Sequence, residues 1–108
     1  MIRNQDVEKI AQFAGELSRQ ISGLNWFAFG SCCDRIDEAE DLDLIVIYED
    51  MEAAALVRAS LREFELYPLL DVSMFSAEEQ RDHCFIERRG AMPLEVFSKA
   101  TNRVSMTP

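Results

Sequence analysis

The chain has 108 residues, of which 48% are hydrophobic and 29% are charged, and its formal net charge is −9. This length suits a single domain with one hydrophobic core, and the acidic balance argues against a general nucleic-acid-binding protein, because such proteins present Lys and Arg to phosphates. The sequence has no long apolar run, no apolar signal core and three irregularly spaced cysteines, which argues against a membrane-spanning or disulfide-stapled protein and predicts a cytoplasmic one.

The first half of the chain predicts a helix followed by two strands. Apolar residues recur at three- and four-residue spacing over roughly residues 5–22, which predicts an amphipathic N-terminal helix closed by Gly23. Residues 26–29 predict a short buried strand, and residues 42–48, rich in β-branched and large apolar side chains, predict a central strand. The acidic segment over residues 32–40 between them predicts a helical turn and a loop.

The middle of the chain predicts a second helix and a third strand. Asp50 is a suitable N-cap for a helix over roughly residues 51–66, whose apolar residues again follow a helical period. The Tyr67-Pro68 pair ends that helix, because the residue before a proline disfavours the helical conformation. Residues 69–75 then predict a strand.

The last third of the chain completes the expected fold. A capping box of Ser76 and Glu79 begins a third helix, which ends at Gly90 after two arginines. Residues 92–97 predict a fourth strand, placed at a sheet edge by its proline, and the tail over residues 101–108 is expected to be frayed. Together the elements predict an α+β fold, an α/β sandwich with a small mixed β-sheet of about four strands flanked by three helices.

The most informative segment joins the first two strands. Gly30 and Ser31 follow the first strand, and Asp41 and Asp43 open the second. Side chains two residues apart on a strand share a face, and two neighbouring carboxylates repel each other unless a cation joins them. Mg²⁺ prefers such oxygen ligands and commonly shares them with substrate phosphates, while a Gly-Ser turn offers backbone N–H groups and a hydroxyl to a phosphate.

Each of these residues has a simpler explanation as well. Asp41 belongs to an acidic run, and such runs are usually solvated loops. Asp43 is harder to explain in that way, because apolar residues stand on both sides of it and an unpaired carboxylate inside a strand is unfavourable. Asp71 either lies inside the third strand or is a turn residue close to Pro68, and Arg35 either contacts a phosphate or is an exposed loop arginine.

The segment resembles the signature of the nucleotidyltransferase superfamily that includes DNA polymerase β, in particular its minimal nucleotidyltransferase branch. That signature is Gly-Ser, about ten residues, Asp-x-Asp, and a third carboxylate on a later strand. Gly30, Ser31, Asp41 and Asp43 match it, and Asp71 stands where the third acid belongs. Two differences are that nine residues separate Ser31 from Asp41 and that the usual Arg-Gly after Gly-Ser-x-x is replaced by a shifted Arg-Ile.

The resemblance implies a palm-like fold and the transfer of a nucleoside monophosphate from a nucleoside triphosphate, with ATP as the expected donor, to a hydroxyl acceptor. Asp41, Asp43 and Asp71 would hold Mg²⁺ or Mn²⁺, and Asp71 would accept the proton of the attacking hydroxyl. Gly30 and Ser31, with Arg35, would hold the phosphates. The three carboxyl groups should therefore converge at one end of the sheet.

The acceptor is not identified by the sequence. Small members of this branch resemble antitoxins that pair with a helical HEPN-type toxin, so a partner protein is one expected source of acceptor recognition. The alternative is a non-catalytic binding protein with the same fold that masks a basic partner or senses a nucleotide, and the short loop between Ser31 and Asp41 favours it. Both hypotheses allow a protein partner, and metal-dependent transfer distinguishes them.

Overall fold

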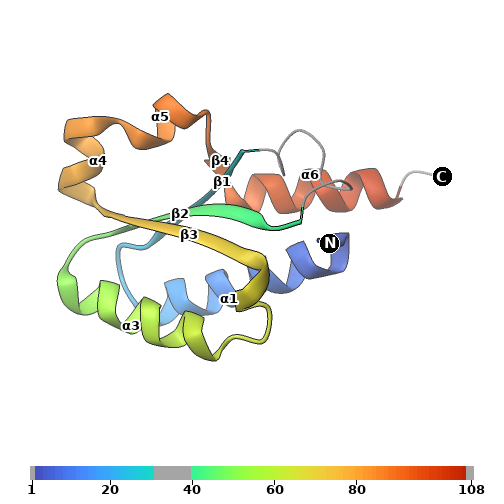
Figure 1. Ribbon diagram of the computed structural model, residues 1–108, viewed down its shortest axis with the longest axis horizontal. Helices are drawn as coiled ribbons and strands as arrows, with labels where there is room; N and C mark the ends of the chain where they lie inside the picture. Colours follow the sequence, from blue (N-terminus) through green and yellow to red (C-terminus); the bar gives the residue numbers. More distant parts are fainter. Residues whose placement is uncertain (1, 31–39, 107–108) are drawn as a thin grey trace.

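The structure is a computed structural model, and it describes residues 2–30 and 40–106. The elements in chain order are α1 (Asn4–Gln20), β1 (Asn25–Phe29), β2 (Leu42–Tyr48), α3 (Met51–Glu63), the 3₁₀ turn η2 (Tyr67–Leu69), β3 (Leu70–Ser76), α4 (Ala77–His83), α5 (Phe85–Arg89), β4 (Met92–Pro93) and α6 (Leu94–Met106). Figure 1 shows the sheet between helices on two sides. The predicted α+β sandwich with a four-stranded mixed sheet is confirmed.

The sheet has the strand order β3-β2-β1-β4. β2 and β3 are parallel, and β1 is antiparallel to both β2 and β4. In this register Asp43 lies opposite Phe29 on one side and opposite Asp71 on the other. Because facing residues of neighbouring strands point to the same side of a sheet, these three side chains share one face.

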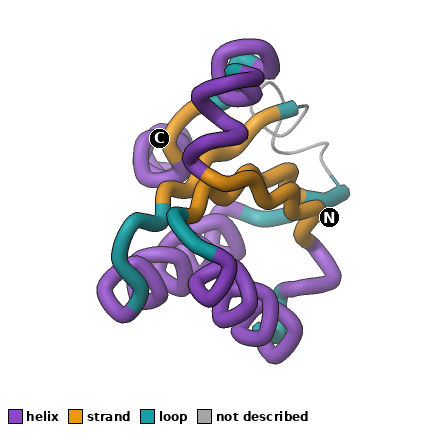
Figure 2. Tube along the Cα trace, turned by 90° about the vertical axis from the view of Figure 1, so that its left-hand side faces the viewer, coloured by secondary structure: helices purple, strands orange, loops and turns teal. Residues whose placement is uncertain are grey.

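The opposite face of the sheet carries the main core. Leu42, Leu44 and Val46 alternate along β2 and are fully buried there, as expected for a central strand covered by helices. α1 and α3 cover this face, as Figures 1 and 2 show, and α6 packs against α1, β1 and β4. Apolar burial on this side supplies the main driving force for folding.

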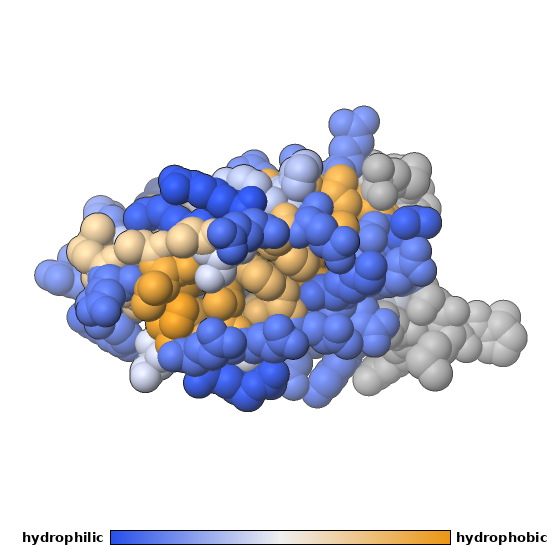
Figure 3. Space-filling model, turned by 90° about the horizontal axis from the view of Figure 1, so that it is seen from below, coloured by the Kyte–Doolittle hydropathy of each residue, from blue (hydrophilic) through white to orange (hydrophobic). Residues whose placement is uncertain are grey.

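The outer surface of this helical layer is largely hydrophilic. Figure 3, which views the molecule from below, shows an apolar area bordered by hydrophilic side chains. Two large apolar residues of α3, Met51 and Leu56, are exposed. Among the described residues, no helix is long and apolar enough to cross a membrane.

The face that carries Asp43 is covered in part by the two short helices α4 and α5, which Figure 2 shows on the other side of the sheet from α1 and α3. Phe85 of α5 stacks on Phe75 of β3, with ring centroids 3.8 Å apart and planes 12° from parallel. Ile45 and Ile47 of β2 are buried on this face. The part around Asp43 is more open, since Asp43 itself is only half-buried.

The third predicted helix is divided in two, which corrects the sequence interpretation. Cys84 ends α4 in a left-handed conformation (φ 52°), and α5 starts at the next residue. The turn is held by Gln80, whose amide nitrogen donates to the carboxylate of Glu87 and whose side-chain oxygen accepts the backbone N–H of Ile86. The capping box of Ser76 and Glu79 at the start of α4 is present as predicted.

The structure also corrects the prediction of a fourth strand over residues 92–97. β4 contains only Met92 and Pro93, at the edge of the sheet beside β1, and α6 begins at Leu94. Leu94, Phe97 and Thr101 recur at helical spacing and are all buried, so burial of one helical face outweighs the β propensity of this segment. Thr101, the first residue of the tail expected to fray, is instead buried, and the helical backbone of α6 continues through Met106. Residues 107–108 of that tail lie outside the described residues.

Candidate functional site

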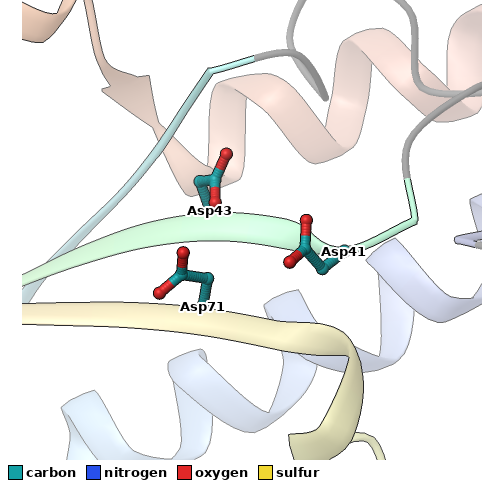
Figure 4. A group of neighbouring side chains, drawn as sticks. All are labelled: Asp41, Asp43 and Asp71. Carbon is teal, nitrogen blue, oxygen red and sulfur yellow. The ribbon is translucent and has the colours of Figure 1, made fainter.

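Three aspartates converge at one end of the sheet. Asp41 directly precedes β2, Asp43 is the second residue of β2, and Asp71 is the second residue of β3. One carboxylate oxygen from each lies within 4.8 Å of those of the other two, and Figure 4 shows the three side chains gathered over the strands that carry them. The structure thus brings together the three carboxylates that the sequence singled out.

The parallel pairing of β2 with β3 explains this convergence. Both strands start at the same end of the sheet, and the register sets Asp43 directly opposite Asp71. The alternation of side chains places Asp41 and Asp43 on the same side. β1 runs antiparallel to β2, so its last residue, Phe29, and the following Gly30 arrive at the same place.

The electrostatics of the site are dominated by negative charge. Burial raises the pKa of the Asp43 carboxyl above 3.8, and the neighbouring charges of Asp41 and Asp71 raise it further, as does a side-chain hydrogen bond with Asp71. The positive charge of Arg89 lowers the same pKa, as the weakest contribution. Ionised Asp43 is therefore disfavoured in the protein alone, and a bound cation would remove that penalty.

The chemistry and spacing of the donors fit a divalent ion. Mg²⁺ binds oxygen ligands at about 2.0–2.1 Å, so two oxygens on one ion lie at most about 4.2 Å apart. Because the three donor oxygens already lie within 4.8 Å of one another, small side-chain rotations would suffice to bring them around one ion. Asp41 and Asp71 are exposed, so they could also contact a bound substrate.

Gly30 can lie directly beside the acidic cluster because it has no side chain. Its φ of +82° is in the region that favours glycine, and a Cβ at this position would collide with Oδ2 of Asp43. The chain can therefore turn away from β1 immediately beside Asp43 only with glycine here. The resemblance assigns Gly30 to phosphate binding, and the structure adds a close approach to Asp43, a candidate metal ligand.

Arg89 is a site residue that sequence reasoning missed. Its guanidinium carbon lies 5.1 Å from the centre of the Phe29 ring, and Phe29 lies opposite Asp43 in the β1–β2 register. In the sequence, Arg89 appeared only as a cation near the end of a helix. No local spacing relates it to Asp43, so only the packing of α5 on the sheet could reveal it.

Two of the predicted phosphate-binding residues, Ser31 and Arg35, lie outside the described residues, so the structure does not place them. A separate groove of about 660 Å³ lies between α1 and α6, lined by residues that include Gly15, Trp26 and Ser98. None of its lining residues belongs to the acidic cluster. The carboxylates form an open surface site, and we consider their chemistry more informative about function than the size of that groove.

Comparisons of the chain with protein-family models, with curated proteins and with solved structures found no match.

Proposed function

We propose that this protein is a metal-dependent nucleotidyltransferase that moves a nucleoside monophosphate, with ATP as the expected donor, to a hydroxyl acceptor. The observation that carries the proposal is the convergence of Asp41, Asp43 and Asp71 at one end of the sheet, with donor oxygens within 4.8 Å of one another. The resemblance of Gly30-Ser31 and the Asp-x-Asp pair to the polymerase β-like signature supplies the reaction class. An acidic cluster alone would support only cation binding.

In the proposed reaction, the acceptor oxygen forms a bond to the α-phosphorus of the triphosphate while the bond from that phosphorus to the bridging oxygen of pyrophosphate breaks. Mg²⁺ or Mn²⁺ at the three aspartates would neutralise charge on the attacking and leaving oxygens. Asp71, which is exposed, is assigned to accept the proton of the attacking hydroxyl. Most of the rate gain would then come from positioning and electrostatic stabilisation.

Phosphate binding is assigned to the turn after β1. Gly30 turns the chain with a positive φ beside Asp43, and Ser31 follows it in the sequence. Backbone N–H groups in such a turn can bind phosphate oxygens. This arrangement would hold the triphosphate next to the carboxylates, which is the geometry that a metal-bridged transfer requires.

Recognition of the acceptor is assigned to a protein partner, and a helical HEPN-type protein in a toxin–antitoxin pair is the partner class that the resemblance implies. The net charge of −9 favours a partner with a basic surface. The same proposal places the reaction in the cytoplasm, where nucleoside triphosphates and Mg²⁺ are available.

The proposal is tested by incubating the purified protein with α-labelled nucleoside triphosphates, Mg²⁺ and a lysate of its source, and then searching for labelled protein or small molecule. Asp41→Asn and Asp43→Asn should abolish the label and leave partner capture intact. Asp82→Asn, which removes the same charge from an exposed position on α4, is the matched control and should retain the label.

The alternative function, a non-catalytic binding protein, predicts a different result. Wild type would then capture a partner and leave no label on it, and the aspartate variants would behave in the same way. A labelled product that persists in both aspartate variants would show that another site performs the transfer, and it would refute the assigned mechanism.

A further inference from the structure

The short helix α5 brings an arginine to the edge of the acidic site. α5 is fixed on the sheet by the stack of Phe85 on Phe75. Its C-terminal end is closed by Gly90 in the left-handed conformation, and the backbone N–H of Ala91 donates to the carbonyl oxygen of Ile86 at 3.0 Å. The stack anchors the start of α5, and the pairing of β4 with β1 anchors the chain just after its end, so the fold defines the position of its last residue, Arg89.

The Arg89 guanidinium lies over an aromatic ring beside the site. Its central carbon is 5.1 Å from the centre of the Phe29 ring, within the usual range for a cation–π contact. Phe29 is the residue opposite Asp43 and the one directly before Gly30. Arg89 therefore lies over the residue that is paired with Asp43 and that directly precedes Gly30.

Arg89 makes no ion pair with Asp41, Asp43 or Asp71. Among the described residues, the ion pairs are Arg3–Asp6, Lys9–Glu65 and Lys99–Glu95, and none includes Arg89. Arg89 is close enough to Asp43 to lower the pKa of its carboxyl, yet it makes no direct ion pair with it. The side chain is exposed, and an aromatic contact on one face of a guanidinium leaves its N–H edge available.

We propose that Arg89 binds the phosphates of the nucleoside triphosphate and neutralises the pyrophosphate as it leaves. This inference rests on the proposed nucleotidyltransferase function, and it identifies a substrate-binding residue outside the Gly-Ser and Asp-x-Asp signature. A guanidinium donates two parallel hydrogen bonds to phosphate oxygens, and a positive charge held in place favours the negative charge that develops on the leaving group. The ring of Phe29 serves as the support that holds the guanidinium in position.

The experiment measures binding of inorganic tripolyphosphate in the presence of Mg²⁺ by isothermal titration calorimetry, because this probe has the phosphates without a base or a sugar. Arg89→Ala should weaken binding roughly 10- to 100-fold, the usual effect of losing a charge-assisted bidentate contact. Arg89→Lys should be intermediate, because lysine keeps the charge but lacks the paired donors.

The matched control is Arg88→Ala. It removes the same charge from the neighbouring position of α5, and Arg88, like Arg89, is exposed. Binding in this variant should fall less than about threefold, the size expected for screened surface charge. Titration of Mg²⁺ alone should show that Arg89→Ala still binds the metal, which separates phosphate binding from the metal site.

Three results would overturn the inference. Equal tripolyphosphate affinity in wild type and Arg89→Ala would show that Arg89 does not contact phosphate, while the proposed function would stand. An equal loss of tripolyphosphate affinity in Arg88→Ala and Arg89→Ala would show that general surface charge, and not a specific contact of Arg89, causes the effect. If wild type binds no tripolyphosphate with Mg²⁺, the proposed function itself fails, and this inference fails with it. Should Arg89→Ala not fold, as judged by circular dichroism, the comparison of Arg89→Lys with wild type decides.

Discussion

Replacing Asp43 by asparagine should stabilise the metal-free protein and abolish its response to Mg²⁺. Asp43 is the half-buried member of the cluster, and the charges of Asp41 and Asp71 both disfavour its ionised form. Asparagine has nearly the same shape and no charge, so the substitution removes two repulsive pairs and leaves the packing almost unchanged. It also removes a ligand that a divalent ion would need.

The size of the effect follows from the spacing of the carboxylates. At 4.8 Å, two unit charges repel by about 0.9 kcal/mol in water and by about 3.5 kcal/mol at an effective dielectric constant of about 20. Because Asp41 and Asp71 are exposed, the lower value applies more closely, and salt screens it further. We therefore expect Asp43→Asn to raise the free energy of unfolding of the metal-free protein by about 1–2 kcal/mol.

The assay is thermal unfolding of both proteins with EDTA and with increasing Mg²⁺. At about ten times its dissociation constant, Mg²⁺ should stabilise wild type by about 1.4 kcal/mol, since it binds only the folded protein. For a domain of this size that corresponds to a rise in Tm of roughly 5 °C. Asp43→Asn should start higher and show no such rise, and Asp82→Asn, which changes the same charge outside the site, should respond like wild type. Identical Mg²⁺ responses of wild type and Asp43→Asn would refute the metal site.

Four further predictions test individual parts of the structure. The folded-state pKa of Asp43 is raised above 3.8, so the Asp43 carboxyl favours folding of the wild type most below that pH, and this contribution is lost as the pH rises through the folded-state pKa. The stability advantage of Asp43→Asn over wild type, measured without metal by urea unfolding, should therefore be near zero at low pH and grow towards neutrality. Gly30→Ala should lower stability by about 1–2 kcal/mol and weaken Mg²⁺ binding, because the new Cβ meets a positive φ and the Asp43 carboxylate; unchanged calorimetric titrations would contradict the close approach. Cys84→Gly should raise stability by about 0.5–1 kcal/mol by relieving the left-handed conformation at φ 52°, whereas Cys84→Ala should leave it unchanged; equal melting temperatures for the two variants would contradict the strain. Ser76→Ala should cost about 1 kcal/mol in thermal unfolding through loss of the α4 capping box, and an unchanged Tm would show that the cap contributes nothing.

The sequence determined those elements whose pattern is local. The apolar period predicted α1, and the run of β-branched residues predicted β2 with the bounds that the structure shows. Alternation along a strand placed Asp41 and Asp43 on one face before any tertiary contact was considered. Ser76 and Glu79 likewise predicted the start of α4, because a capping box involves residues only three apart.

The tertiary structure decided what depends on contacts between distant residues. The predicted third helix is divided at Cys84, where the chain turns and Phe85 stacks on Phe75 of the distant strand β3. Leu94 and the residues after it form a helix because their apolar face is buried in the core, and this burial outweighs local strand propensity.

The candidate site shows the same division. The motif and the resemblance nominated the three aspartates, but the parallel register of β2 and β3 brought Asp71 opposite Asp43. Arg89 lies at the site because α5 packs on β1 and β3. Gly30 lies beside Asp43 because β1 ends next to the start of β2. Side-chain alternation is a property of one strand and can be read from the sequence, whereas strand register and helix docking are set by the whole core and cannot.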